Sequence, residues 1–150
     1  MKNILIIVGI VVLLLIAGAW GSRSLSENNP RMVSMNGLHW HPQLIIYVKG
    51  EKQNIPVNIG IGPQYSSLPT FDSSMRMTAM HTHEPDGTIH LEFSGRVMKD
   101  DIILGNFFRI WGTDMRQFGA NMQMTVNGMT SVEYENYQMH DKDVIELHYE

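Results

Sequence analysis

The stretch HTHEPDGTIHLE, from His81 to Glu92, sets three histidines and two glutamates around a Pro-Asp-Gly turn. The segments TAMHTH (residues 78–83) and TIHLEF (residues 88–93) contain β-branched residues and alternate between polar and apolar side chains, and they flank a turn. This pattern predicts a β-hairpin. A slip of one residue between two paired strands turns every side chain to the other face. The register of this hairpin therefore decides whether its histidines gather on one face.

Two registers are open to a hairpin with this turn, one with an even loop and one with a bulge. The even register pairs His81 with His90, His83 with Thr88, Ala79 with Glu92, Met80 with Leu91 and Thr78 with Phe93. It separates a polar face from a mostly apolar face, whereas the odd register sets Met80 against Glu92 and mixes the two. Because a half-buried sheet needs separated faces, we expect the even register. One face then carries His81, His83, His90 and Glu92.

A second pair of histidines lies in HWH, where His39 and His41 share a face if the segment is a strand, about 7 Å apart by twice the strand rise. Imidazole is the commonest protein ligand of metals and binds them when it is neutral. Together the two groups predict a metal site with the ligands His39, His41, His81, His83, His90 and Glu92. The alternative is a solvated polar face. His140 and His148 are isolated, and the remaining acids of the hairpin, Glu84 and Asp86, are interpreted as turn residues.

The composition limits the metal ligands, because the chain of 150 residues contains no cysteine. Disulfides, thiolate ligands and thiol catalysis are excluded, so ligands must come from His, Asp, Glu or Met. Of the 12 methionines, Met75, Met77 and Met80 precede or enter the hairpin, and Met122 and Met124 are at strand spacing. Thioethers suit Cu(I) and imidazole suits both copper oxidation states, so copper is expected first, with zinc and iron as alternatives. The competing interpretation is that these methionines fill the core.

The amino terminus determines the expected compartment. After a single lysine, an apolar run extends from Ile4 to Ala19, and the Trp-Gly pair that follows brings it close to the length of a membrane span. We expect residues 1–21 to be a membrane anchor that enters the membrane through residues 4–20. The small residues at 17–19 also fit the cleavage site of a signal peptide. The positive charge at the start favours a cytoplasmic amino terminus, which predicts a single-pass cell-membrane protein with its domain outside the cytoplasm, secreted if the amino terminus is cleaved.

The rest of the chain divides into a linker and one domain. Residues 22–37 are small, polar and aperiodic, which predicts a flexible linker, and the domain occupies residues 38–150. Hydrophobic residues make up 43% of the chain and charged residues 17%, which fits a globular domain. The net charge of −4 leaves no basic surface for nucleic acid, so nucleic acid is not an expected partner.

Strand patterns dominate the predicted domain. QLIIYV (residues 43–48) and NIPVNIGI (residues 54–61) are expected to pair across the turn KGEKQ. DDIILGNFFRIWG (residues 100–112) has helical spacing, an aspartate to cap it and Gly112 to end it. We therefore expect a mostly β or α+β fold of small antiparallel sheets with one packed helix. The carboxy-terminal strand, Asn-Gly turn, loop and last strand are similar to the end of β-grasp domains.

Several segments also resemble a motif set. HWHPQLIIYVKGE, IPVNIGIG, MHTHEPDGTIHLEF and LGNFFRIWG cover most of residues 38–112. They are similar to blocks of a poorly characterised family of membrane-anchored extracytoplasmic proteins of archaea and bacteria with a His-rich β domain. The resemblance implies the same domain and marks the six candidate ligands as family positions, but it implies no reaction. Cupins also carry a His-x-His strand, yet Gly87 and Thr88 stand where their glutamate is expected, so the sequence departs from that pattern.

Three functions are open on the sequence alone. The first is an anchored copper carrier, buffer or delivery factor that serves a membrane-bound metalloenzyme or transporter. The second is a metalloenzyme with three His ligands and an open position. The third is a metal-free interaction domain tethered to the membrane. Since the sequence has no Ser-His-Asp order, phosphate loop or paired catalytic carboxylates, binding is favoured over catalysis.

Overall fold

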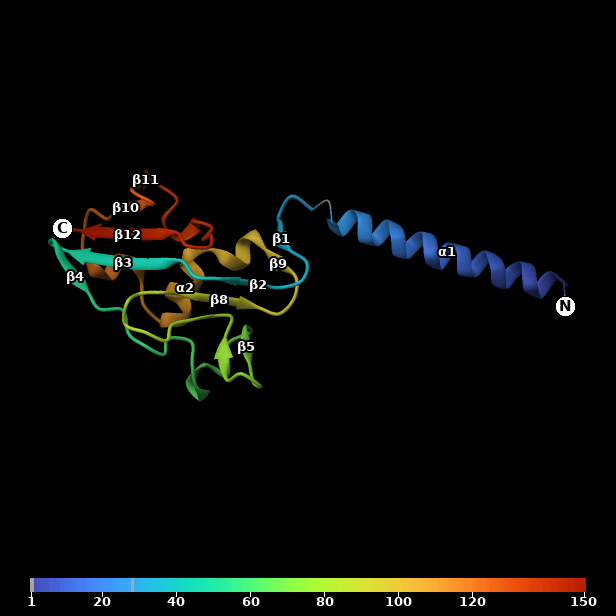
Figure 1. Cartoon of the computed structure of the whole chain (residues 1–150), viewed down its shortest axis with the longest axis horizontal. Coiled ribbons are helices and arrows are strands. Elements are labelled where there is room, and N and C mark those ends of the chain that lie inside the picture. The colour runs from blue at the N-terminus through green and yellow to red at the C-terminus, as the bar shows by residue number, and fades with distance from the viewer. Residues whose placement is uncertain (1, 28) are drawn as a thin grey trace.

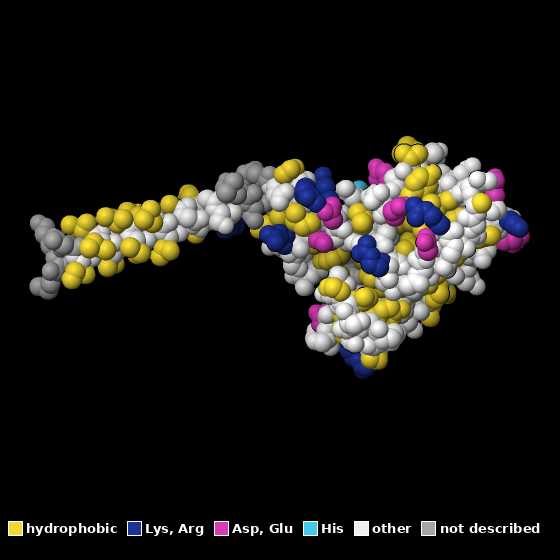
Figure 2. All heavy atoms as spheres, turned by 180° about the vertical axis from the view of Figure 1, so that it is seen from behind, with side chains coloured by type: hydrophobic (Ala, Val, Ile, Leu, Met, Phe, Trp, Pro, Cys, Tyr) yellow, Lys and Arg dark blue, Asp and Glu magenta, His cyan; other side chains and the backbone are white. Residues whose placement is uncertain are grey.

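The computed structural model describes residues 2–27 and 29–150. Its first element is the long helix α1 (Lys2–Glu27), which extends away from the rest of the chain (Figure 1). Apolar side chains cover the side of this helix seen in Figure 2. The stretch Ile4–Arg23 is long and apolar enough to cross a membrane, and the protein buries none of it. A signal sequence passes the same test, so α1 is a candidate membrane span.

The segment expected as a linker, residues 22–37, carries secondary structure at both ends. Helix α1 continues to Glu27, and strand β1 (Met32–Ser34) pairs with β9 (Val97–Met98). The guanidinium of Arg31 also pairs with the Asp100 carboxylate. A strand of three residues whose partner lies more than sixty positions away leaves no local periodic pattern, so the sequence did not reveal it.

The main sheet has five strands in the order β11-β10-β12-β3-β4. These strands are β3 (Gln43–Val48), β4 (Glu51–Gln53), β10 (Gln123–Val126), β11 (Met129–Ser131) and β12 (Val144–Tyr149). The hairpins β3-β4 and β10-β11 flank the last strand, β12, which runs parallel to β3 and antiparallel to β10 (Figure 1). Two hairpins around a last strand parallel to the first form a β-grasp-like sheet. The predicted α+β class is confirmed, with one parallel pair added to the expected antiparallel ones.

The first hairpin turns earlier than the sequence pattern indicated. Lys49 and Gly50 have φ values of 52° and 84°, which close a tight turn of two residues. Strand β4 therefore lies inside KGEKQ, the segment expected as the turn. Residues 54–61, expected as a strand, form an irregular loop with a single bridge at Ile61. This part of the prediction was wrong, because Ile55 and Ile59 pack in the core without a strand partner and Val57 between them is exposed.

Helix α2 (Leu104–Trp111) is shorter than predicted. The aspartates expected to cap it belong to a preceding 3₁₀ helix, where the Asp101 side chain accepts a hydrogen bond from the Met98 N–H at 2.7 Å. Gly112 ends α2 at a φ of 74°, as expected. The 3₁₀ helices of the chain are Pro63–Tyr65, Lys99–Ile102, Met115–Phe118 and Tyr134–Asn136.

One core joins α2, the main sheet and the hairpin strands. Its fully buried side chains include Leu44, Ile46, Met80, Leu91, Leu104, Phe107, Met124, Ile145 and Leu147. Burying a side chain of this size contributes about 1.5–3 kcal/mol each. The strands β3 and β12 alternate between buried and less buried residues, as strands with one face on a core do.

The six predicted site residues lie on or directly beside a separate three-stranded sheet in the order β2-β8-β7. It consists of β2 (Leu38–Trp40), β8 (His90–Phe93) and β7 (Met80–His81), and the small hairpin β5 (Phe71–Asp72) with β6 (Met77–Thr78) lies beside it. The Leu44 N–H of β3 donates to the Gly87 carbonyl at 2.9 Å. Because only His41 and Pro42 separate β2 from β3, this sheet continues the path of a core strand.

The irregular loop of residues 54–62 holds the strand that carries the histidines. Thr82, the residue between His81 and His83, is buried and bonded to this loop from both its backbone and its side chain. Its N–H donates to the Ile59 carbonyl at 3.1 Å, and its hydroxyl donates to the Pro56 carbonyl at 2.9 Å. The loop therefore fixes the backbone from which the two histidines project.

Replacing Gly60 with alanine tests this close approach. A Cβ at this position would lie 2.3 Å from Thr78 Oγ1 and 2.5 Å from the Met80 carbonyl oxygen, at a φ of +76°. We expect the free energy of unfolding to fall by about 3 kcal/mol or more, measured by urea denaturation of the full chain in detergent. Gly50→Ala is the matched control, since Gly50 has a φ of +84° but nothing within 4 Å of its Cβ. The control should cost only about 1 kcal/mol, and equal losses would mean that the contact with β6 and β7 is unimportant.

Candidate metal centre

The hairpin that carries the histidines adopts the even register. Strands β7 and β8 are antiparallel, with Met80 opposite Leu91 and His81 opposite His90. Met80 and Leu91 are buried in the core on the apolar face of the sheet. The predicted register is confirmed, and it sets the histidines on the other face.

The turn end of this hairpin differs from the prediction. Thr88 pairs with Gln43 at the start of β3 instead of with His83. Asp86 stabilises the turn, as expected, because its Oδ1 accepts a hydrogen bond from the Thr88 N–H at 2.8 Å. Since the main sheet takes over the pairing of Thr88, His83 lies beyond the ladder and is exposed.

Five histidine rings form one continuous group, which we call the histidine cluster (His39, His41, His81, His83 and His90). Strand β2 lies beside β8 with His39 opposite Glu92, so the HWH pair adjoins the hairpin face. The ring centroids are 4.7 Å apart for His39–His41, 4.8 Å for His41–His90, 4.7 Å for His83–His90, 4.8 Å for His81–His83 and 5.3 Å for His81–His90. A chain of contacts between neighbours therefore connects all six predicted site residues, with Glu92 joined through His39 and His90.

Two groups of three within the cluster have the spacing of metal ligands. His81, His83 and His90 each offer a ring nitrogen within 4.8 Å of the others, and so do His39, His41 and His90. A tetrahedral ion with bonds of about 2.0–2.1 Å holds its ligand atoms about 3.3 Å apart. Small rotations of the rings would therefore close either group around an ion.

His81 is the most constrained ligand. Its side chain is fully buried, and its Nδ1 lies 3.0 Å from the Thr78 carbonyl oxygen. A carbonyl only accepts hydrogen bonds, so Nδ1 carries the proton and Nε2 has the lone pair. Within the described part of the chain, that buried Nε2 has no hydrogen-bond partner. A backbone carbonyl on one nitrogen and an open lone pair on the other is the arrangement found at histidines that bind metals.

Glu92 borders the histidine cluster. Its Oε1 is 3.0 Å from His39 Nε2 and 3.8 Å from His90 Nδ1. A carboxylate in contact with imidazoles favours bound cations and can orient a ligand through its N–H group. Glu92 fits either as an additional ligand or as the hydrogen-bond partner of one.

Sequence reasoning missed two further carboxylates. Glu84, interpreted as a turn residue, has its Oε2 3.9 Å from His90 Nε2. Asp141 has its Oδ1 3.9 Å from His41 Nδ1 and accepts a hydrogen bond from the His41 N–H at 3.0 Å. His41 and Asp141 are a hundred positions apart in the sequence, so no local pattern indicates this contact. With Glu92, three acidic groups border the cluster and favour a cation there.

The loop that presents Asp141 is held by a buried acid. The Asp143 carboxylate accepts hydrogen bonds from Tyr137 Oη at 2.7 Å, from Asn127 Nδ2 at 2.9 Å and from the His140 N–H at 2.7 Å. Burial and the neighbouring carboxylate raise the pKa of Tyr137, so the phenol stays protonated and able to donate. The position of Asp141 beside the cluster therefore follows from the packing of the main sheet.

Burial favours the neutral form of His81 and His90. It lowers the pKa of His81 in spite of the hydrogen bond from Nδ1 to Thr78, which acts in the opposite direction. It also lowers the pKa of His90, and the neighbouring His83 and His41 add to the effect because a second positive charge is unfavourable. Neutral imidazole is the form that binds metals, so at neutral pH both rings are ready to bind one.

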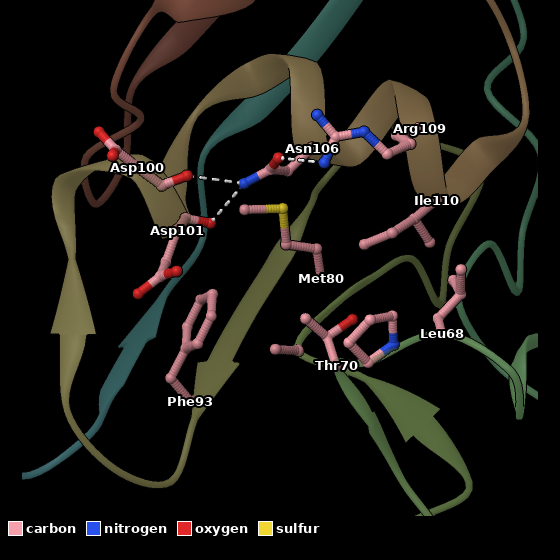
Figure 3. Close-up of a pocket in the computed structure, with 11 residues that line it drawn as sticks. Leu68, Thr70, Met80, Phe93, Asp100, Asp101, Asn106, Arg109 and Ile110 are labelled. Atoms are coloured by element: carbon pink, nitrogen blue, oxygen red, sulfur yellow. Dashed lines mark hydrogen bonds between the residues drawn. The ribbon is translucent and has the colours of Figure 1, made fainter.

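Met80 and Met124 do not join the cluster. Met80 and Met124 are buried in the core, so for these two residues the core-filling interpretation is right. Met80 lies on the reverse face of the sheet, where it lines a cavity of about 340 Å³ together with Phe93 and Ile110 (Figure 3). Thioether ligation therefore gains no support from them, and nitrogen and oxygen donors dominate the site.

The two remaining histidines lie outside the cluster, as expected. His148 stacks on the Tyr47 ring at 4.7 Å, and the His140 ring is 5.8 Å from that of Trp40. Neither belongs to a group with metal-ligand spacing among the residues searched. They are exposed histidines that can serve as matched controls for the cluster. Hardly any histidine surface is visible from the side drawn in Figure 2.

Comparison of the chain with protein-family models, with curated proteins and with solved structures finds no match. The family resemblance of the HWH and HTH blocks therefore stays a prediction. The function has to be argued from the geometry of the cluster.

The metal-free protein should lose stability as the pH falls below about 6.5. Because burial lowers the folded-state pKa of His81 and His90, the unfolded chain binds protons at these groups before the folded chain does. The loss begins near the ordinary histidine pKa of about 6.5 and amounts to at most about 1.4 kcal/mol per pH unit for each proton. Urea denaturation of the full chain in detergent with EDTA, at about pH 7.5 and pH 5.5, measures it.

Two variants identify the groups responsible for this pH dependence. His81→Gln should make the free energy of unfolding less dependent on pH, because one of the buried imidazoles is gone. His148→Gln, outside the cluster, should leave the dependence as it is. An equal dependence in both variants would assign the titration to other groups.

Proposed function

We propose that this chain is a membrane-anchored, extracytoplasmic metal-binding protein, and that copper is the ion it binds best. The observation that carries the proposal is the buried Nε2 of His81, which has no hydrogen-bond partner in the described part of the chain and has two further imidazoles beside it. An unsatisfied buried acceptor costs about 1–3 kcal/mol. A bound ion would satisfy this nitrogen and use a geometry that the fold already maintains.

The choice of copper rests on the donor set. The cluster offers neutral nitrogens bordered by carboxylates, and the affinity of such sites for divalent ions rises to a maximum at Cu²⁺, ahead of Zn²⁺. With Met80 and Met124 in the core, the case for a thioether Cu(I) site is weaker than the sequence alone indicated. We therefore assign Cu(II) to the site, with zinc as its main competitor.

The candidate span α1 supports an anchored carrier. His39 follows the end of the candidate span, Arg23, by 16 residues, so even an extended chain separates them by roughly 55 Å at most. If α1 crosses the membrane, the cluster stays within that distance of the membrane surface. The partner that fits is a membrane-bound metalloenzyme or transporter that receives the ion.

Carriage is favoured over catalysis because the cluster lies on an open face. Two cavities of about 340 Å³ and about 500 Å³ border the same sheet, and no histidine lines either of them, while Glu92 lines the larger one. A substrate pocket usually encloses most of its ligand around the reacting group. A cluster with three exposed histidines, His39, His41 and His83, suits the exchange of an ion with a partner.

A metalloenzyme is the second candidate, favoured by one observation. Three imidazoles leave one position of a tetrahedral ion open, and the Glu84 carboxylate beside His90 could accept a proton from water bound there. Adding azide to the Cu(II)-loaded full chain tests this. A large change of the copper EPR spectrum would favour an open, enzyme-like site, and an unchanged spectrum would favour a closed carrier site.

The metal proposal is tested by thermal unfolding of the full chain in detergent with Cu(II), Zn(II) or Fe(II) added. An ion that binds only the folded state stabilises it, by about 2.7 kcal/mol when the free ion is at 100 times its Kd. We expect the largest rise of Tm with Cu(II), a smaller one with Zn(II), and reversal by EDTA. Elemental analysis of the protein after desalting should find the bound ion.

Matched double variants locate the site. His81→Ala with His83→Ala should abolish the rise of Tm, because it removes two of the three inner ligands. His140→Ala with His148→Ala removes two histidines outside the cluster and should leave the rise unchanged. A wild-type protein with no bound ion and no change of Tm would exclude both metal functions and leave the tethered interaction domain.

A further inference from the structure

The two groups of three ligands share one residue, His90. We call His81, His83 and His90 the inner triad, and His39, His41 and His90 the outer triad. The centroid of the His90 ring is 4.7 Å from that of His83 and 4.8 Å from that of His41, so this ring stands midway between the two pairs. The cluster thus consists of two overlapping triads that share His90.

The two triads differ in burial. The inner triad contains the fully buried His81, whereas the side chains of His39 and His41 are 63% and 41% exposed. Binding at the inner triad satisfies a buried nitrogen on the fixed ring of His81, so of its two unshared side chains only the exposed His83 has to be ordered. Binding at the outer triad must order two exposed side chains, those of His39 and His41. The inner triad is therefore the tighter site, and the outer triad is the more accessible one.

His90 can serve only one ion at a time while it is neutral, because a neutral imidazole has a single lone pair. Either nitrogen can be the one that binds. Its Nδ1 lies 3.8 Å from Glu92 and its Nε2 lies 3.9 Å from Glu84. If one nitrogen of His90 binds the ion, the other carries the N–H. A carboxylate is near enough to accept a hydrogen bond from that N–H after a small rotation.

We infer that the outer triad is the entry and exit site for the ion, and that the inner triad is its resting site. The inference rests on the proposed metal-binding function and deepens it. The ion first binds His39 and His41 together with His90. It then exchanges these two ligands for His81 and His83 while His90 keeps hold of it, and it leaves by the reverse steps. No bond other than metal–nitrogen bonds changes, and no electron is transferred.

Stopped-flow loading of the full chain in detergent with Cu(II) tests this inference. Trp40 lies next to His39 and His41 in β2, and quenching of the tryptophan fluorescence follows the arrival of Cu(II) at the cluster. For His39→Ala with His41→Ala, we expect an equilibrium Kd within about threefold of the wild type, but loading and release to EDTA slowed by about tenfold or more. For His81→Ala with His83→Ala, we expect fast loading to persist and the affinity to fall by about 100-fold or more.

Two additional variants guard against misfolding and non-specific effects. His83→Ala changes an exposed residue, so it tests the inner triad without disturbing the core, and we expect an affinity about tenfold weaker with an unchanged loading rate. His140→Ala with His148→Ala removes the histidines outside the cluster and should alter neither the affinity nor the rates.

Three results would overturn the inference while leaving metal binding intact. The first is wild-type loading and release rates in the variant that lacks His39 and His41. The second is an equal loss of affinity from removal of either pair, which indicates one shared site of five ligands. The third is two ions bound at once per wild-type chain, which indicates a bridging His90. Absence of any bound ion in the wild type would instead overturn the proposed function itself.

Discussion

His81 and His90 stand opposite each other on neighbouring antiparallel strands, and a shift of one residue would set His81 against Leu91 and Met80 against Glu92. That shift would turn His81 toward the core and Met80 toward the polar face, so the core itself fixes the register. The loop of residues 54–62 reinforces it by bonding Thr82 on both its backbone and its side chain. The chemistry of the polar face is therefore determined by packing on the apolar face.

The main sheet supports the three-stranded sheet of β2, β8 and β7. A β-grasp-like arrangement puts β12 beside β3, and the long insertion between β4 and α2 returns to the start of β3 through Thr88 and Gly87. Gly87 lies so close to this strand that a Cβ there would be 2.1 Å from the Leu44 carbonyl oxygen. The hairpin turn is thus seated against the core, and the candidate ligands His90 and Glu92 that follow it are held by the same contacts.

Short-range patterns in the sequence predicted the parts of this protein that depend on neighbouring residues. The register of β7 with β8, the end of α2 at Gly112 and the shared face of the histidines all follow from side-chain alternation or from one turn residue. What the sequence could not reveal depends on distant contacts. The parallel pairing of β12 with β3, strand β1 and the approach of Asp141 to His41 join segments far apart along the chain. Glu84 was missed because His83 leaves the ladder early, when β3 takes Thr88 as its partner.

Only His41 and Pro42 stand between the strand that carries the outer ligands and the core strand β3. The backbone of the cluster is therefore already ordered before an ion arrives, and loading can move little more than imidazole rings. The loaded and empty forms would then present nearly the same shape to their surroundings. A partner that distinguishes the loaded from the empty form would therefore have to recognise the charge of the site or bind the ion directly, because the fold would change little in shape.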